Sequence, residues 1–115
     1  MPTIKVQTSV AAGTQESNVI QGNQFEFLAV PCRVQVFARQ SNAGTPGVGE
    51  VEVFFSQELQ MPQAPVTIGA AGINVNTDLL VDSFGDRGDR IVVREVETGG
   101  AQLALIDCMV VITPL

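Results

Sequence analysis

Apolar and polar residues alternate at every second position along most of this chain, which is the spacing of a β-strand with one buried face. No stretch of about a dozen residues keeps apolar positions at helical spacing. Turn-forming residues interrupt the alternation about every ten residues, as in proteins built from short strands. The pattern therefore predicts an all-β fold, an antiparallel β-sandwich of about eight strands. The clearest predicted strands are 4–8, 24–29, 32–39, 50–56, 90–96 and 102–112.

The segments between these strands are less regular. Pro31 is expected to end the strand at 24–29, because proline cannot donate to a strand ladder. Glycine and proline in 41–49 predict a loop that joins two strands as a hairpin, and those in 57–76 predict a long crossover connection. Shorter elements are predicted at 17–20, which pairs locally, at 66–68, an edge strand, and at 78–81, a short strand or one helical turn.

The length and the charge of the chain limit its class. A chain of 115 residues is close to the commonest size of one domain, so residues 1–115 are predicted to form a single β-sandwich domain. Twelve acidic and six basic residues give a net charge of −6, which repels phosphate backbones and anionic lipids. Lysine occurs once, at Lys5, and the arginines are scattered. We therefore expect neither nucleic acid nor a membrane as a partner.

Histidine, tryptophan and tyrosine are absent from the chain. Without histidine, a serine or cysteine nucleophile lacks its usual base, and the one lysine lies near the N-terminus. Glycan sites usually hold the sugar against aromatic rings, whereas the aromatic residues here are six phenylalanines, set mostly at predicted strand positions. We expect no enzyme activity, no catalytic residue, no metal and no cofactor.

The densest charged region contains four aspartates, which invite comparison with a calcium site. Their spacing of three to four residues differs from an EF-hand loop, which places ligands at every second position. We expect a turn instead, in which carboxylates cap backbone N–H groups beside glycines and arginines offset the charge; calcium binding is the alternative. The tripeptide Arg87-Gly88-Asp89, a known adhesion sequence, has the composition of a tight turn. The four aspartates are Asp78, Asp82, Asp86 and Asp89.

Two cysteines, Cys32 and Cys108, lie in predicted strands far apart in the sequence. Two cysteines do not make a disulfide framework, so buried free thiols are the expectation. A bridge between facing sheets is the alternative, because spacing alone does not show whether the two Cα atoms come within bonding range. Zinc would need further ligands of a kind the chain lacks.

Several predicted strands carry apolar residues on both faces. Phe37 and Phe54 lie opposite the core face of their strands, and 102–112 is apolar on both sides. A sandwich uses one apolar face per strand, so the outer faces need a cover. Two explanations are open: neighbouring subunits cover them, or the N-terminal segment and the 57–76 connection fold over them.

A resemblance extends over the whole chain. Its basis is the Gln- and Asn-containing strands over 24–40, the run 88–93 that enters a late strand, and the apolar final strand that ends with 110–114. In these features the chain resembles small jelly-roll proteins of virus particles, especially phage capsid decoration or cement proteins and single jelly-roll capsid subunits. The resemblance implies a jelly-roll-like sandwich and a symmetric homo-oligomer, with a trimer favoured, that binds the capsid protein lattice through loops and a terminal arm.

The resulting hypothesis is a structural virion protein of a bacteriophage that decorates and stabilises the capsid shell. The first residues lack the pattern of a signal peptide, so synthesis in the host cytoplasm is expected. The absence of a basic arm favours the outside of the shell. The expected contact regions are Met1–Gln21 and Gln57–Asn76. Two alternatives remain: a single jelly-roll capsid subunit, and a ligand-binding or adhesion module of the carbohydrate or tail-fibre type.

Overall fold

The computed structural model describes residues 2–42, 44 and 46–115. These residues form eight β-strands joined by turns and loops, and they contain no helix long and apolar enough to cross a membrane. The strands are β1 (Thr3–Val10), β2 (Gln15–Glu16), β3 (Cys32–Gln40), β4 (Gly49–Phe55), β5 (Glu58–Pro65), β6 (Leu79–Gly85), β7 (Ile91–Glu97) and β8 (Ala104–Pro114).

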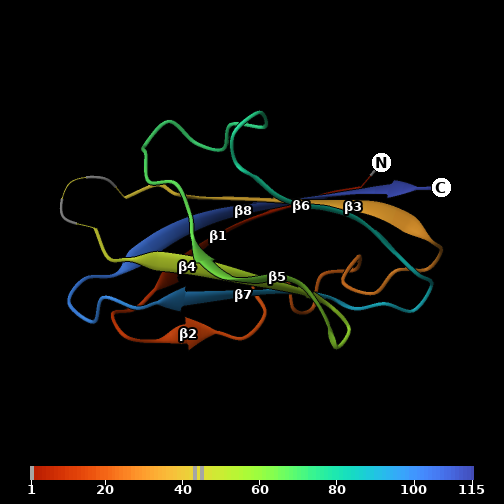
Figure 1. The fold of residues 1–115 in the computed structure, drawn as a ribbon, viewed down its shortest axis with the longest axis horizontal. Coiled ribbons are helices and arrows are strands. Elements are labelled where there is room, and N and C mark those ends of the chain that lie inside the picture. The colour runs from red at the N-terminus through yellow and green to blue at the C-terminus, as the bar shows by residue number, and fades with distance from the viewer. Residues whose placement is uncertain (1, 43, 45) are drawn as a thin grey trace.

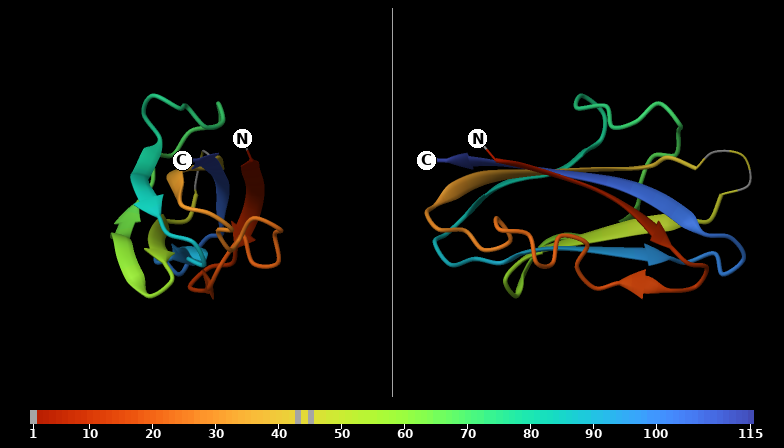
Figure 2. Two further views of the ribbon diagram at one scale, coloured as in Figure 1. Left: turned by 90° about the vertical axis from the view of Figure 1, so that its right-hand side faces the viewer. Right: turned by 180° about the vertical axis from the view of Figure 1, so that it is seen from behind.

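The eight strands form two four-stranded sheets that face each other (Figures 1 and 2). Sheet A has the order β1-β8-β3-β6 and sheet B the order β2-β7-β4-β5. Antiparallel pairs join β1 with β8, β2 with β7, β3 with β6, and β4 with β5. The eight strands thus form one long hairpin with its tip at the β4–β5 turn. Successive pairs of this hairpin lie alternately in sheet A and sheet B, which is the topology of a jelly roll. The predicted antiparallel β-sandwich of jelly-roll type is therefore confirmed.

The core lies between the sheets and consists of every second residue of the long strands, as the alternation predicts. In β8 the buried side chains alternate with half-buried ones along the whole strand. β7 contributes Ile91 and Val93 to the same core. The inward-facing residues of β8 are Ala104, Ile106, Cys108, Val110 and Ile112.

The predicted strand at 24–29 is wrong. This segment is a series of turns that crosses one end of the sandwich, and within it Phe27 makes an isolated bridge to Arg90. Glu26 is buried instead, because its carboxylate accepts hydrogen bonds from the backbone N–H of Gly22 and from Arg90. Phe27, which alternation assigns to the apolar face of this strand, is 60% exposed.

The segment 57–76 is not one crossover connection. Its first part is β5, an edge strand that forms a hairpin with β4. The register between β4 and β5 shifts around Pro62, because Val51 faces Ala64 while Val53 faces Met61. Proline is tolerated in an edge strand, because the backbone N–H groups on its open side donate to no neighbouring strand. Because Pro62 and Pro65 interrupt the sequence pattern of a strand, alternation did not predict β5.

Two other segments also differ from their prediction, and a third agrees with one of its two alternatives. The segment 17–20 forms turns, and the short pairing occurs earlier, at β2. The loop 41–49 is no hairpin, because β3 and β4 belong to different sheets; its residues 43 and 45 lie outside the described residues. The element predicted at 78–81 as a short strand or one helical turn is a strand, β6, which extends to Gly85.

A loop over residues 66–78 lies above the outer side of sheet A (Figure 1). Arg39 of β3 fastens it, since its Nε donates to the carbonyl of Gly69 at 3.1 Å and its Nη1 to Asp78 Oδ2 at 3.1 Å. Phe37, on the same outer face, is 5% exposed. Part of the 57–76 connection therefore covers an outer face, as one of the two explanations predicts, whereas the N-terminal segment supplies strands β1 and β2.

Candidate functional site

The four aspartates of the predicted acidic cluster serve separate contacts. Asp78 accepts the Arg39 bond and a backbone N–H from Asn74 at 2.7 Å. Asp82 accepts two hydrogen bonds, of 2.8 and 2.6 Å, from Arg33 on the outer face of sheet A, and this guanidinium lowers the pKa of Asp82. Among the described residues, no group of three or more Cys, His, Asp or Glu is placed to hold a metal ion.

The other two aspartates, Asp86 and Asp89, lie in the turn between β6 and β7. Asp89 Oδ2 accepts the backbone N–H of Asp86 at 2.8 Å, and its Oδ1 accepts the Ser56 hydroxyl at 3.4 Å. Gly88 has a φ of 87°, which glycine adopts without strain. Arg87-Gly88-Asp89 is therefore the tip of a capped turn, and the Asp89 carboxylate is engaged within it.

The two cysteines are buried free thiols, as expected. Both lie in sheet A, and Cys108 faces Ala38, which is six residues along β3 from Cys32. Six residues of a strand span about 20 Å, which is well beyond the reach of a disulfide. The alternative of a bridge between facing sheets is therefore wrong.

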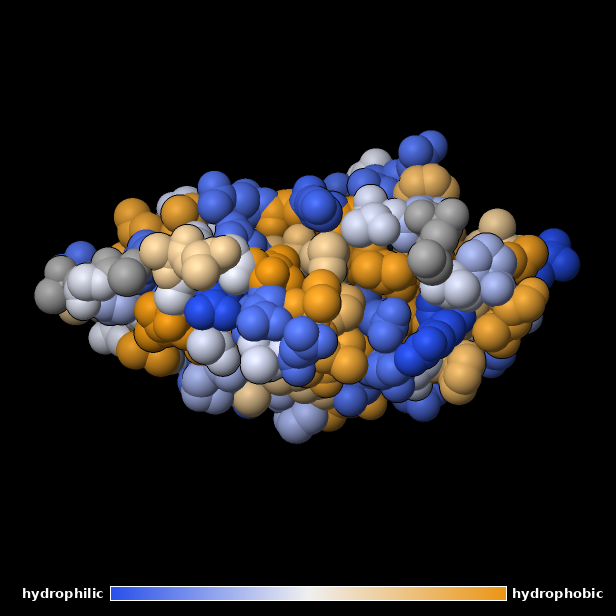
Figure 3. All heavy atoms as spheres, turned by 90° about the horizontal axis from the view of Figure 1, so that it is seen from above, coloured by the Kyte–Doolittle hydropathy of each residue, from blue (hydrophilic) through white to orange (hydrophobic). Residues whose placement is uncertain are grey.

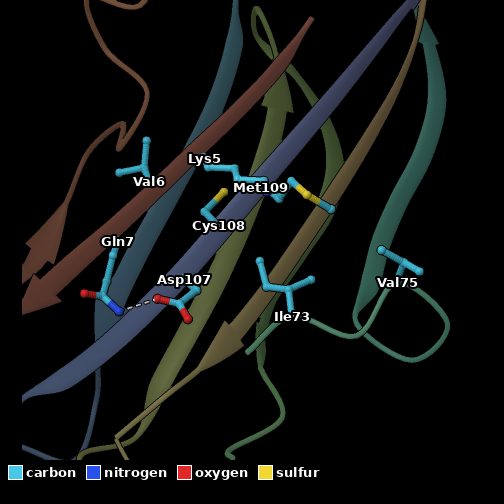
Figure 4. A pocket seen from close by; sticks show the side chains of 8 residues that line it. All are labelled: Lys5, Val6, Gln7, Ile73, Val75, Asp107, Cys108 and Met109. Carbon is cyan, nitrogen blue, oxygen red and sulfur yellow. Dashed lines mark hydrogen bonds between the residues drawn. The ribbon is translucent and has the colours of Figure 1, made fainter. Parts of the chain in front are cut away.

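A groove of about 530 Å³ runs along the outer side of sheet A, between β1, β8 and the loop 66–78 (Figure 4). Ile73 and Val75 of the loop form one wall. On the sheet side, Gln7 Nε2 of β1 donates to Asp107 Oδ1 of β8 at 2.7 Å. This hydrogen bond joins the two polar side chains at the floor of the groove. The remaining lining residues are Lys5, Val6, Cys108 and Met109.

A second hollow, of about 260 Å³, opens at the end of the sandwich that carries both termini. Inward-facing residues of sheet A, among them Cys32 and Ile112, form its floor, and the turns at 24–30 form its rim. Apart from Gln24, every lining residue is apolar. The hydrophobic core therefore reaches the surface at this end.

Large apolar side chains are exposed around the same end. Phe27 is 60% exposed, with the Arg90 guanidinium 5.9 Å from its ring centre. Phe84, at the end of β6, is 67% exposed, and Val30 is also exposed. We call Phe27, Val30 and Phe84 the terminal patch. On the outer side of sheet A, Figure 3 shows apolar groups in the middle of the face and again toward this end.

The opposite end is closed by Glu97, the last residue of β7. Its Oε1 accepts the backbone N–H groups of Gly13 and Gly100 at 3.0 and 2.6 Å. Its Oε2 accepts those of Val48 and Gly99 at 2.6 and 2.8 Å. These donors lower the pKa of Glu97 to about 2, with Gly100 and Gly13 contributing most. The Glu97 clasp, as we call this arrangement, joins three loops.

Gly47 lies beside this clasp, and a side chain there has no room. A Cβ would meet the backbone carbonyls of Gln102 and Leu103, the latter at 2.8 Å. Because backbone atoms cannot rotate away, Gly47→Ala is expected to lower the free energy of unfolding by about 2 kcal/mol. Urea unfolding measures this loss, and Val48→Ala, at the exposed next position of the same loop, is a control expected to cost less. A Gly47→Ala variant as stable as the wild type would contradict the packing of this end.

Glu95, two residues before the clasp, points into the core. Its side chain is fully buried, and neither carboxylate oxygen has a hydrogen-bond partner among the described residues. Burial raises the pKa of Glu95 to about 8, helped by the charges of Glu16 and Asp107. Burial likewise raises the pKa of the Cys108 thiol, with a smaller contribution from Glu95. This thiol is therefore protonated and unreactive at neutral pH.

Sequence analysis did not single out Glu95, Glu97 or the terminal patch. The alternation in 90–96 could have predicted the burial of Glu95, because Glu95 lies on the same face of the strand as Ile91 and Val93. Phe27 carried no such signal, because its place in a predicted strand is compatible with either the core or a contact surface. Both positions depend on contacts made by turns distant in sequence, which no local pattern contains.

In comparisons with protein-family models, with curated proteins and with solved structures, the chain shows no significant match.

Proposed function

We propose that this chain is a non-enzymatic structural virion protein that binds a bacteriophage capsid shell and stabilises it as a decoration protein. The observation that carries the proposal is the terminal patch beside an apolar hollow, at the end of the sandwich where the core reaches the surface. Phe27 is exposed on the rim of the open core end, and Phe84 is exposed at the neighbouring end of β6. Exposed aromatic side chains of this kind are typical of contact surfaces, whose binding energy they dominate. Jelly rolls are common among capsid proteins, although the fold alone does not assign a function.

Charge supports the outside of a shell over its inside. The chain has a net charge of −6, and four of its arginines are engaged in ion pairs with carboxylates. An inner position would place this acidic surface against packaged nucleic acid, which repels it. On the outside the same charge keeps free subunits soluble until the shell offers its complementary surface. A homo-oligomer bridging capsid subunits in the virion is the arrangement this favours.

The terminal patch is tested by substitution. The double variant Phe27→Ser/Phe84→Ser is expected to weaken binding to capsids about 30-fold or more, as the loss of central aromatic contacts does. Co-sedimentation with capsids assembled from the major capsid protein of the same genome measures the binding. Leu103→Ser is the matched control, because Leu103 is exposed at the opposite end of the sandwich and is expected to bind normally. Equal loss in the control and the double variant would count against the patch.

The same strand order also fits a subunit that forms the shell itself. The two roles differ in what the pure protein does alone. A shell-forming subunit closes into particles without another capsid protein, whereas a decoration protein stays small until shells are added. Electron microscopy of the concentrated protein distinguishes them: closed particles would replace the decoration role by the shell-forming one.

A further inference from the structure

Four strands lie at sheet edges, namely β1 and β6 in sheet A and β2 and β5 in sheet B. An edge strand presents unpaired N–H and C=O groups, and proteins block such edges with prolines, bulges or short strands. β2 has two residues, β5 carries two prolines and an irregular register, and the register of β6 shifts where it pairs with β3. β1 has eight residues, an unbroken register with β8 and no proline.

The free hydrogen-bonding groups of β1 can be assigned from its ladder. The backbone N–H of Ile112 donates to the carbonyl of Pro2, so even-numbered residues of this segment point their backbone groups toward β8. The odd-numbered residues Thr3, Lys5, Gln7 and Ser9 therefore point theirs to the open side. In the described chain no strand pairs with β1 on that side.

The side chains of β1 suit a second strand. Val6 and Thr8 on the inner face are half-buried, whereas Cys108, the neighbour of Val6 in β8, is buried, so the open side leaves part of the sandwich interior uncovered. β1 carries no carboxylate, and its one charge, Lys5, has no ion-pair partner among the described residues. Although the chain has a net charge of −6, a second copy can therefore approach β1 without repulsion between carboxylates of the two paired strands.

We propose that β1 pairs antiparallel with β1 of a second copy around a two-fold axis at Val6, so that sheet A continues as one sheet of eight strands. The inference rests on the proposed function, because it names the contact through which copies associate. In this register Lys5 faces Gln7 of the second copy and Thr3 faces Ser9, and each of these pairs exchanges two backbone hydrogen bonds. Lys5 then lies in the same cross-strand row as the Gln7–Asp107 hydrogen bond of the second copy, which supplies charge complementarity.

A proline on the open side separates this pairing from folding. In Gln7→Pro the lost N–H is one that β8 does not use, so the fold survives while the pairing is blocked. We expect the dimer dissociation constant to rise about 100-fold or more. Gln7→Thr is the matched control, since it loses the same Asp107 contact and keeps the N–H, and it is expected to remain dimeric. Light scattering at several concentrations measures the mass, and thermal unfolding shows that both variants fold.

The register is tested by cysteine crosslinking. Val6 faces itself across the proposed axis with a Cα separation of about 4.5 Å, which is within disulfide range. In a Cys108→Ala background, which removes the free thiol opposite residue 6 in β8, Val6→Cys is expected to form an oxidised dimer, whereas Thr8→Cys, which faces Ile4, is not. Crosslinking through Thr8→Cys instead of Val6→Cys would overturn the register.

Two results would overturn the pairing itself. One is a wild-type monomer at every concentration, and the other is an oligomer that Gln7→Pro leaves intact, such as the trimer that the resemblance implies. Neither result decides the proposed function, because a monomer or trimer that still sediments with capsids retains it. Loss of capsid binding in a protein that still dimerises through β1 would instead contradict the proposed function and leave this pairing standing.

Discussion

Replacing Glu95 with glutamine is expected to raise the free energy of unfolding by about 1 kcal/mol at pH 5 and by about 4 kcal/mol at pH 8. The physical reason is the burial of this carboxyl group, whose two oxygens have no hydrogen-bond partner among the residues that the structure describes. Ionising it inside the core is costly, so the folded protein holds the proton up to a pKa of about 8, against a model value of 4.5.

The sign of the pH dependence follows from these two values. Between about pH 4.5 and pH 8 the folded chain binds the proton and the unfolded chain has lost it. Stability that is fully present below pH 4.5 is therefore lost as the pH rises toward 8. Glutamine is the neutral isostere of the protonated acid and does not titrate, so the two proteins diverge across this window.

Urea unfolding at several pH values from 5 to 8 measures the divergence. Glu58→Gln is the control, because Glu58 is exposed on β5 and its loss is expected to leave the pH dependence of the wild type intact. A difference between Glu95→Gln and the wild type that stays constant with pH would show that Glu95 is not held as a buried neutral acid.

Replacing Glu97 with glutamine is expected to lower the melting temperature by about 10 °C at pH 7. Each oxygen of the carboxylate accepts two backbone N–H groups, which come from three loops in all. In glutamine an NH2 group replaces one of these oxygens, so two backbone N–H groups lose their acceptor and face another donor. Orphaned donors at a buried end are costly, and the loops at this end are expected to loosen first.

The clasp also has a defined pH window. The pKa of Glu97 is about 2 in the folded chain against a model value of 4.5, so its contribution is present above pH 4.5 and is lost as the pH falls toward 2. The difference in melting temperature between Glu97→Gln and the wild type should therefore shrink from pH 5 to pH 2. Calorimetry over this range measures it, and a difference that does not change with pH would contradict the clasp.

Alternation predicted the fold class and most of the strands because burial of one sheet face acts on every second residue. It works for β8, where five inward-facing residues follow without a break. It failed at 24–29, where Glu26 is drawn inward by Arg90, a residue distant in sequence. It also missed β5, because prolines at an edge strand cost less than the pattern assumes.

Less of the candidate surfaces than of the fold could be predicted from the sequence. Apolar outer faces were visible in the sequence, but whether a loop or another subunit covers them depends on Arg39 reaching the loop 66–78. The clasp and the buried Glu95 arise where distant loops meet β7. The exposure of Phe27 follows from turns that replace the predicted strand. Each of these is a product of tertiary contact, and none has a local signature.

We propose that this jelly roll acts by binding a capsid surface. Co-sedimentation of the wild-type protein with assembled capsids, followed by electron microscopy of the particles, tests it most directly. We expect saturable binding at a simple ratio to the capsid subunits, with extra density at symmetry-related positions on the outer surface. Particles that bind none of the protein at saturating concentration, and whose surface shows no added density, would contradict it.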